Sequence, residues 1–134
     1  MSSRPRQSLT LTLLQAREAA MRFFRPSLNE HGLTEQQWRV IRILRQQGEM
    51  EIYRLADLAC ILKPSMTGVL VRMEAAGLVK RRKAETDQRR VLVELAQKGE
   101  EIFGSMSQRM EANYQALQGP VSYTHLRAHE TRGN

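Results

Sequence analysis

The chain has 134 residues, room for one domain, and 41% of them are apolar, enough to fill a hydrophobic core. Lys and Arg outnumber Asp and Glu by 21 to 14, which leaves a formal net charge of +7. The aromatic content of 5% argues against a base-stacking RNA-binding surface, and no apolar run approaches the roughly 20 residues of a membrane span, which excludes one.

The first predicted element is a helix that starts near Leu9. Apolar and small side chains recur along it at alternating spacings of four and three residues, at Leu9, Leu13, Ala16, Ala20 and Phe23. Such a narrow seam is typical of a helix that packs lengthwise along another helix, either in the same chain or in a second subunit. Pro26 should kink or end this helix, and Gly32 should stop whatever follows.

A capping box at residues 34–37 (Thr-Glu-Gln-Gln) begins the next predicted helix, with Leu33 and Trp38 placed as its hydrophobic staple. This helix should run over about residues 35–46, end at Gly48 and bury Trp38, Ile41 and Leu44. A shorter helix should follow over about residues 52–60 and bury Ile52, Leu55, Ala56, Leu58 and Ala59.

Pro64 signals the start of a third helix, because proline suits the first helical turn. Four apolar residues at spacings i, i+3, i+4 and i+7 form its inward stripe: Met66, Val69, Leu70 and Met73. Its opposite face carries small and polar side chains, and Gly77 followed by Leu78 predicts a Schellman ending. Two short helices joined by a tight turn, the second polar on its outer face, are typical of a helix-turn-helix.

Two β-strands are predicted next, over residues 78–83 and 91–95, joined by the loop 84–90. Residues 72–90 contain seven Lys and Arg against three acids, a local charge of +4. A basic hairpin directly after a helix-turn-helix makes a winged helix, and its charge indicates either a polyanion partner or a solvated surface. From about Gln97 a helical pattern resumes through Ile102, Phe103, Met106, Met110 and Tyr114.

The last residues, 120–134, break these trends, since they lack a helical stripe and hold two of the three histidines. Their sequence (Pro-Val-Ser-Tyr-Thr-His-Leu-Arg-Ala-His-Glu-Thr and onward) resembles a translated transposon-end adapter from sequencing libraries. We therefore expect a non-native tail, with the native coding sequence lost near Gly119. A genuine disordered tail is the alternative.

The wing region resembles the signature of the MarR family of transcriptional regulators, Asp-x-Arg followed by Leu-Thr-x-x-Gly. The resemblance rests on residues 78–81 (Leu-Val-Lys-Arg), residues 87–90 (Asp-Gln-Arg-Arg), Leu95 and Gly99. Residues 72–79 also resemble the end of the family's recognition helix, and the likeness covers about residues 8–119. The implied fold is mainly α with a small β-hairpin, a winged helix-turn-helix with flanking dimerisation helices.

By this resemblance the chain divides into four parts. Residues 1–32 would contribute a helix to the dimer interface, residues 33–96 would form the DNA-binding winged helix-turn-helix, and residues 97–119 would start the C-terminal dimerisation helix. Residues 120–134 would be the non-native tail. The family's last helix would then be missing, so the implied fold is C-terminally truncated, with a weakened dimer and exposed apolar residues around Phe103, Met106 and Met110.

Two further stretches, residues 14–20 and 59–68, resemble the branch of the family that represses homoprotocatechuate catabolic operons. This likeness implies a sequence-specific repressor of an operon for an aromatic acid, homoprotocatechuate or 4-hydroxyphenylacetate. Its implied partners are double-stranded DNA with a pseudo-palindromic operator, a second copy of the chain in a homodimer, and a small phenolic acid that releases the repressor from DNA.

The helix that starts at Pro64 should enter the major groove by its N-terminal end. Ser65 and Thr67 suit hydrogen bonds to phosphates or base edges, and Gly68 allows close approach to DNA or tight packing. Arg89 suits the minor groove, where the negative potential is deepest, with Asp87 holding the loop. The full set of predicted DNA-binding residues is Lys63, Pro64, Ser65, Thr67, Gly68, Arg72, Lys80, Arg81, Arg82, Lys83, Asp87, Arg89 and Arg90.

The effectors of this family usually lie between the DNA-binding lobe and the dimer helices. An aromatic acid needs an apolar slot and a cation for its carboxylate, so we expect Arg17 and Trp38 to bind it, followed by Arg39 and His31. Trp38 is also placed as a core residue and Arg17 as a surface charge, so both alternatives stay open.

Little in the sequence suggests catalysis. Before the tail, only His31 and Cys60 remain of the usual metal-binding and nucleophilic side chains, and no phosphate-binding loop or Gly-x-Ser-x-Gly occurs. We therefore expect no enzyme activity, no cofactor and no metal, in a cytoplasmic protein whose lone cysteine suits a reducing compartment. Two alternatives remain: a redox-responsive regulator through Cys60, although its apolar neighbours are typical of a buried residue, and a non-specific architectural nucleic-acid-binding protein.

Overall fold

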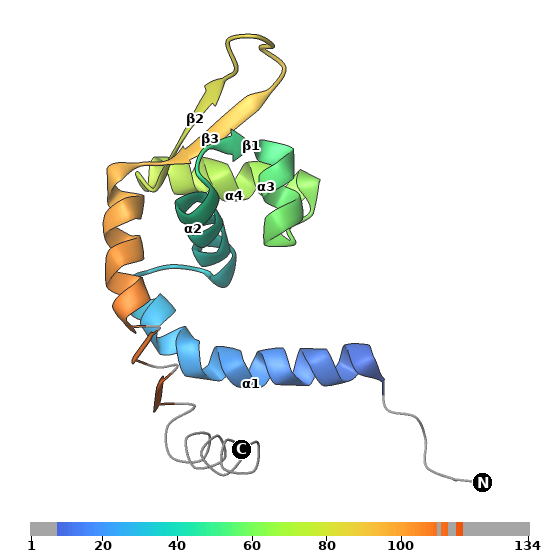
Figure 1. The fold of residues 1–134 in the computed structure, drawn as a ribbon, viewed down its shortest axis with the longest axis vertical. Helices are drawn as coiled ribbons and strands as arrows, with labels where there is room; N and C mark the ends of the chain where they lie inside the picture. Colours follow the sequence, from blue (N-terminus) through green and yellow to red (C-terminus); the bar gives the residue numbers. More distant parts are fainter. Residues whose placement is uncertain (1–7, 110, 113–114, 117–134) are drawn as a thin grey trace, which may run out of the picture.

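The computed structural model describes residues 8–109, 111–112 and 115–116. The elements follow one another as α1 (Leu9–Glu30), α2 (Glu35–Gln47), β1 (Met50–Glu51), α3 (Ile52–Ala59), α4 (Lys63–Ala75), β2 (Val79–Lys83) and β3 (Val91–Leu95), and a C-terminal helix starts at residue 97. Figure 1 shows α2, α3 and α4 at the centre, the hairpin of β2 and β3 projecting at one end, and α1 lying across the other. The predicted fold class, mainly α with a small β-hairpin, is confirmed. Among the described residues, no helix is both long and apolar enough to cross a membrane.

The core forms where α2, α3, α4 and β3 meet. The four stripe residues predicted for α4 are all at most 3% exposed, because their spacing places them on one face of the helix. The burial predicted on α2 is confirmed, and Val40 is buried as well, although it was not predicted. On α3 the prediction is right for four residues and wrong for Leu58, which is 42% exposed, since this short helix buries only one face.

The strands form an antiparallel sheet in the order β1-β3-β2. The hairpin of β2 and β3 is confirmed, and its register pairs Val79 with Leu95 and Arg81 with the fully buried Val93. The strand β1 was not predicted, because two residues carry no periodic pattern. It pairs with Leu92 and Val93 of β3 and so ties the hairpin to the turn between α2 and α3.

Two helix ends are built as predicted. At the start of α2, the Thr34 hydroxyl accepts from the amide of Gln37, while the Gln37 side chain accepts from the amide of Thr34, both at 3.1 Å. At the end of α4, the amide of Leu78 donates to the carbonyl of Met73 at 2.9 Å, and Gly77 takes a φ of +79°. This Schellman ending turns the chain directly from α4 into β2.

The turn between α3 and α4 departs from expectation at Cys60. This residue has a φ of 57°, in the left-handed region that costs a non-glycine residue about 1 kcal/mol. Its amide donates to the carbonyl of Asp57 at 3.2 Å, and the next amide, of Ile61, donates to Ala56 at 2.9 Å. Cys60 is exposed. The expectation that its apolar neighbours would bury it is wrong, because it lies at a chain reversal and not on the inner face of a helix.

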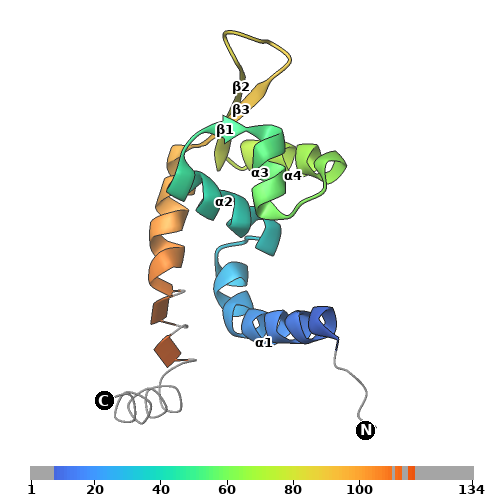
Figure 2. The same cartoon turned by 45° about the vertical axis from the view of Figure 1, so that its right-hand side comes forward.

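The first helix continues through Pro26 to Glu30, so of the two predicted outcomes the kink applies and the ending does not. Figure 2 shows the axis of α1 changing direction towards its C-terminal end. Gly32, with a φ of +67°, closes the helix as predicted. Most of the seam has no cover in one chain, since Leu9 is 72% exposed and Leu13 is 59% exposed.

The C-terminal helix corrects another expectation. Met106 is fully buried and Phe103 is partly buried against the core, where its ring stacks on Trp38 with 5.8 Å between ring centroids. The exposed apolar surface expected around these two residues is therefore absent. The C-terminal helix turns them towards the core, where Phe103 meets Trp38 of α2. Met110, Tyr114 and the segment 120–134 lie outside the described residues, so the expectations about them stand as made.

Candidate nucleic-acid interface and ligand pocket

The outer face of α4 is open to solvent. Burial of its apolar stripe turns the opposite side outward, and the side chains of Ser65, Thr67 and Arg72 are exposed there. Lys63 and Pro64 are also exposed at the leading end of the helix. The structure therefore places the predicted residues of α4 together on one face of a single helix, whose diameter suits the major groove.

Gly68 lies in the middle of this open face. A Cβ built at Gly68 would meet only the Arg72 guanidinium, at 3.5 Å, which is an ordinary van der Waals distance. Tight packing against the rest of the protein therefore does not explain this glycine. The sequence suggested two reasons for this glycine, tight packing or close approach to DNA, and the second is consistent with the open face.

Next to the start of α4, the helix α3 presents a residue that sequence reasoning missed. Tyr53 is 51% exposed, and the Lys63 ammonium lies 5.3 Å from the centroid of its ring. The cation and the ring attract each other at this distance, which orients the Lys63 side chain at the first residue of α4. The sequence did contain a signal for it. Tyr53 is an aromatic residue of α3 that does not belong to the set predicted to be buried.

The tip of the wing, the segment formed by β2, the loop 84–90 and β3, presents Arg89. Its side chain is 92% exposed. The Asp87 carboxylate accepts from the Arg89 amide at 3.0 Å and from its Nε at 3.2 Å, as predicted for a residue that holds the loop. These bonds, first to the backbone and then to the side chain, lower the pKa of Asp87 below its ordinary value.

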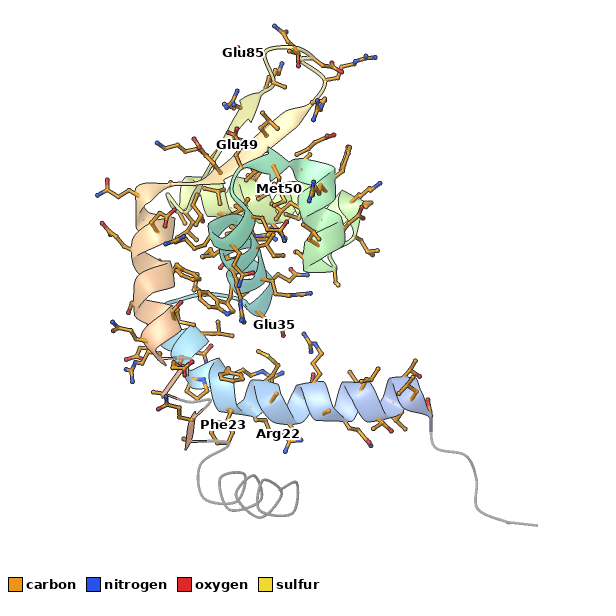
Figure 3. All side chains as sticks on the ribbon, viewed as in Figure 1. Arg22, Phe23, Glu35, Glu49, Met50 and Glu85 are labelled. Carbon is orange, nitrogen blue, oxygen red and sulfur yellow. The ribbon has the colours of Figure 1, made fainter. Side chains whose placement is uncertain are left out.

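The base of the wing is held by three arginines that pair with carboxylates of other elements. Arg81 donates to Glu74 of α4 at 2.9 Å, Arg82 to Glu49 at 2.8 Å, and Arg90 to Glu51 of β1 at 3.2 Å. The hydrogen bond from Arg81 is the main cause of the lowered pKa of Glu74, and Glu49 in turn raises the pKa of Arg82. Figure 3 shows Glu49 at the foot of the hairpin and Glu85 near its tip.

These ion pairs divide the predicted cations of the wing into two groups. Arg81, Arg82 and Arg90 are engaged within the protein, whereas Lys80, Lys83 and the outer nitrogens of Arg89 are free of ion pairs among the described residues. Sequence reasoning assigned Arg89 to the minor groove, but it did not separate the paired arginines from the free lysines of the wing. The acidic partners are distant along the chain, up to 39 positions away, so only the fold shows the pairing.

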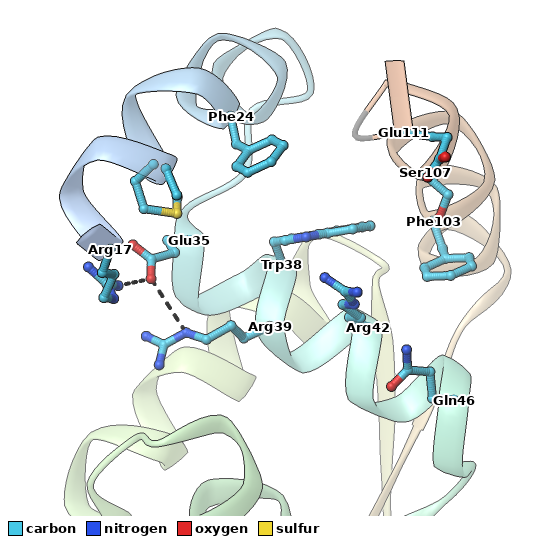
Figure 4. A pocket seen from close by; sticks show the side chains of 12 residues that line it. Arg17, Phe24, Glu35, Trp38, Arg39, Arg42, Gln46, Phe103, Ser107 and Glu111 are labelled. Carbon is cyan, nitrogen blue, oxygen red and sulfur yellow. Dashed lines mark hydrogen bonds and ion pairs between the residues drawn. The ribbon is translucent and has the colours of Figure 1, made fainter. Parts of the chain in front are cut away.

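A pocket of about 500 Å³ lies between α1, α2 and the C-terminal helix. Figure 4 shows the Trp38 indole at its centre, with Phe24 of α1 on one side and Phe103 of the C-terminal helix on the other. Arg17, Trp38 and Arg39, three of the four predicted effector-binding residues, line it. Sequence reasoning missed the rest of the wall: Ala20, Met21, Phe24, Glu35, Arg42, Gln46, Phe103, Ser107 and Glu111.

Charge is distributed unevenly in this pocket. The Glu35 carboxylate accepts a hydrogen bond from Arg17, and the Arg39 Nε lies 3.8 Å from the same oxygen (Figure 4). Arg42, one helical turn after Trp38, makes no ion pair within the part of the chain that the structure describes. The lining holds three arginines against two carboxylates, Glu35 and Glu111, so the pocket carries one surplus positive charge near an aromatic wall.

His31, the fourth predicted effector residue, does not line this pocket. Its Nδ1 bonds to the carbonyl of Ser27 and its Nε2 to the hydroxyl of Ser105, each at 2.9 Å, so it joins the end of α1 to the C-terminal helix. Over the described residues, no group of three or more side chains is arranged to hold a metal ion.

Comparison with known proteins identifies relatives of this chain. A model of the MarR family matches residues 33–91. The homoprotocatechuate degradative operon repressor of Escherichia coli is 48% identical over 111 residues, which are 83% of this chain and 75% of the relative. Among solved structures, the transcriptional regulator PA4135 is 65% identical with a TM-score of 0.83 over 95% of this chain and 96% of the other. NadR in complex with 4-hydroxyphenylacetate is 39% identical with a TM-score of 0.79 over 98% and 96% of the two chains.

Proposed function

The chain belongs to the MarR family, and from this premise we propose that it represses an operon for the breakdown of an aromatic acid by binding a specific operator. The observation that carries the proposal is the adjacency of two exposed elements, the outer face of α4 and the wing with Arg89 at its tip. A helix of groove size beside a cationic finger suits duplex DNA, with α4 in the major groove and Arg89 in the adjacent minor groove.

The DNA contacts we propose fall into two kinds. Ser65, Thr67 and Arg72 reach base edges and phosphates from α4, and the bare backbone at Gly68 lets the helix approach closely. Lys80 and Lys83 neutralise phosphate along the wing, and each such contact should steepen the dependence of log affinity on log salt concentration by about one unit. The proposed surface also includes the remaining predicted residues: Lys63, Pro64, Asp87 and the paired arginines Arg81, Arg82 and Arg90.

We also propose that the active form is a homodimer on a pseudo-palindromic operator, with residues 33–96 as the DNA-binding domain. The exposed leucines of α1 support a helix–helix contact with a second copy, because solvent exposure of so many leucines is unfavourable in one chain. They are Leu9 and Leu13 of the seam, together with Leu11 and Leu14. Phe23 belongs to the same surface, and Figure 3 shows it with Arg22 on the side of α1 that faces away from α2. Two linked DNA-binding domains gain affinity for a two-fold site that one domain lacks.

The pocket is our proposed effector site, and a phenolic acid is the proposed ligand. The volume suits one aromatic ring, which would pack against the stacked rings of Trp38 and Phe103. Arg42 is the arginine best placed for the ligand carboxylate, because Arg17 and Arg39 already face Glu35. The Glu35 carboxylate would accept a hydrogen bond from a ring hydroxyl. The relative that was solved with 4-hydroxyphenylacetate supports this class of ligand.

A titration of DNA with and without the acid tests this function. A duplex enriched from a random library by the full chain serves as the operator, and a shuffled duplex of the same composition is the control. We expect the enriched duplex to bind at least about a thousandfold more tightly at physiological salt, and 4-hydroxyphenylacetate to weaken that binding. Equal affinity for both duplexes would favour the non-specific architectural protein instead.

One alternative is favoured by a specific observation. Cys60 is exposed at the turn that precedes α4, where oxidation would alter the entry to the recognition helix. Treatment with peroxide that leaves affinity for the enriched duplex intact would remove this alternative. We further propose that the protein is not an enzyme and acts in the cytoplasm, which the regulatory role of its relatives supports.

A further inference from the structure

The Arg39 side chain reaches from the pocket to the turn of the helix-turn-helix. Its Nη1 donates a hydrogen bond of 2.6 Å to the carbonyl oxygen of Ala59, the last residue of α3. Its Nε points towards Glu35 (Figure 4), and 3.8 Å separates Nε from Oε1. One guanidinium therefore contacts both the pocket and the segment that leads into the recognition helix.

The carbonyl that Arg39 holds occupies a sensitive position. It lies at the C-terminal end of α3, where the last carbonyls lack intrahelical partners and a positive charge is favourable. The next residue, Cys60, has the left-handed φ of 57°, a conformation that persists only where its surroundings hold it. The helix α4 starts at Lys63, directly after this turn. A displacement of Ala59 therefore shifts the leading end of α4.

At its other end, Arg39 faces a carboxylate, Glu35, that is bonded to another arginine. Glu35 accepts a hydrogen bond from Arg17, and 3.8 Å is too long for a second hydrogen bond to the Arg39 Nε. That Nε is buried and has no hydrogen-bond partner. If Glu35 is released from Arg17, it can close on Arg39 and satisfy this donor, which favours a second pose of the guanidinium.

We propose that Arg39 is the positioning residue that couples occupancy of the pocket to the α3–α4 turn, and hence to the placement of the recognition helix. The inference rests on the proposed function, because it requires that an aromatic acid enters the pocket and weakens DNA binding. A ligand that engages Glu35 or Arg17 changes the distance from Glu35 to Arg39. The guanidinium then moves, and the Ala59 carbonyl that it holds moves with it.

The test is a cycle of four affinities, measured with the full chain, 4-hydroxyphenylacetate and the enriched duplex. In the wild type, saturating acid should lower DNA affinity by about tenfold or more, within the usual range of coupling between sites. Arg39→Lys keeps the positive charge and loses the planar fork that donates in two directions. For this variant we expect the acid and the duplex each to bind within about threefold of the wild type, while the effect of the acid on DNA affinity falls below about threefold.

Arg109→Lys is the matched control. Arg109 pairs with Glu30 of α1, and neither residue lines the pocket, so its substitution should leave the coupling at the wild-type value. Full coupling in Arg39→Lys would overturn the inference and leave the proposed function intact. Absence of any effect of the acid on the wild type would overturn both.

Hydrogen exchange in the wild type keeps the inference testable if Arg39→Lys does not fold. The amides of Cys60 and Ile61 donate to Asp57 and Ala56 within the turn, so their exchange rates report on its integrity. We expect 4-hydroxyphenylacetate to accelerate exchange at these two amides by about tenfold or more, in line with the coupling between the sites. Exchange that is unchanged at both amides on saturation with the acid would overturn the inference.

Discussion

The recognition helix and the wing carry adjacent parts of the proposed DNA-binding surface, yet different forces hold them in place. The helix α4 is fixed by apolar burial, with Met66, Leu70 and Met73 fully buried. The wing is fixed at its base by ion pairs between partly exposed groups, such as Arg82 with Glu49. Apolar burial is not screened by salt and does not depend on protonation, whereas ion pairs near the surface are weakened by both salt and acid. The placement of α4 should therefore be robust, and that of the wing adjustable.

Removing apolar contacts beneath α4 should have the largest effect of all. Met73→Ala deletes a fully buried side chain and should lower the free energy of unfolding by about 2–5 kcal/mol, because a cavity replaces it. Denaturant titration at low and high salt measures this loss, which should be the same at both. A loss below about 1 kcal/mol would show that α4 does not depend on its buried stripe.

Removing the free cation at the tip of the wing should affect binding with little effect on stability. Arg89→Ala should weaken binding to the enriched duplex by about 1–3 kcal/mol, since a guanidinium in the minor groove is lost. Its side chain is 92% exposed and loses only the bond from its Nε to Asp87, so the free energy of unfolding should change little. Lys98→Ala, at an exposed cation of the C-terminal helix, is the matched control for charge. Equal affinity of Arg89→Ala and the wild type would argue against a wing contact.

Gly68 offers a change in which stability and binding move in opposite directions. Gly68→Ala should stabilise α4 by up to about 1 kcal/mol, because alanine favours the helix. The added Cβ meets only the Arg72 guanidinium at an ordinary distance, so no clash opposes this gain. The same Cβ would stand between the backbone and DNA, so affinity for the enriched duplex should fall. Higher stability with unchanged affinity would mean that DNA does not approach the helix here.

Breaking one ion pair at the base of the wing should have a small and salt-dependent effect. Glu49→Gln removes the partner of Arg82 and should cost about 0.2–1 kcal/mol of stability at low salt, and less at high salt. The double exchange Glu49→Arg with Arg82→Glu restores opposite charges and should recover the loss. If the exchange recovers nothing, the pair does not contribute to the position of the wing.

Acid should loosen the wing before it affects α4. The fold lowers the pKa of Asp87 from its ordinary value of 3.8 and that of Glu74 from 4.5. Above these values both carboxylates are ionised, and their bonds to Arg89 and Arg81 contribute fully to stability. This contribution is lost as the pH falls, below 3.8 for Asp87 and below 4.5 for Glu74, and the loss is complete once the pH has passed the lowered pKa of each group in the folded state. Nuclear magnetic resonance titration of the Arg89 amide should report this loss while the signals of Leu70 stay in place. Simultaneous change at both residues would contradict a separate response of the wing.

The sequence predicts most of the DNA-binding unit, because its signals are local. A capping box, a four-residue apolar stripe and a glycine at a helix end each fix one element through neighbours within a few positions. The kink in α1 and the left-handed Cys60 depend on tertiary context, so the sequence left the first open and misjudged the second. The wall of the pocket was missed for the same reason, since Phe24 and Ser107 come together only through the packing of α1 against the C-terminal helix.

Hydroxyl-radical footprinting of the enriched duplex tests binding through two adjacent grooves most directly. With the wild type, we expect protection of the sugars that border the major groove occupied by α4, and of the flanking minor groove. With Arg89→Ala, only the flanking protection should disappear. Flanking protection that persists without Arg89, or a wild-type footprint with no flanking protection at all, would contradict the proposed role of the wing.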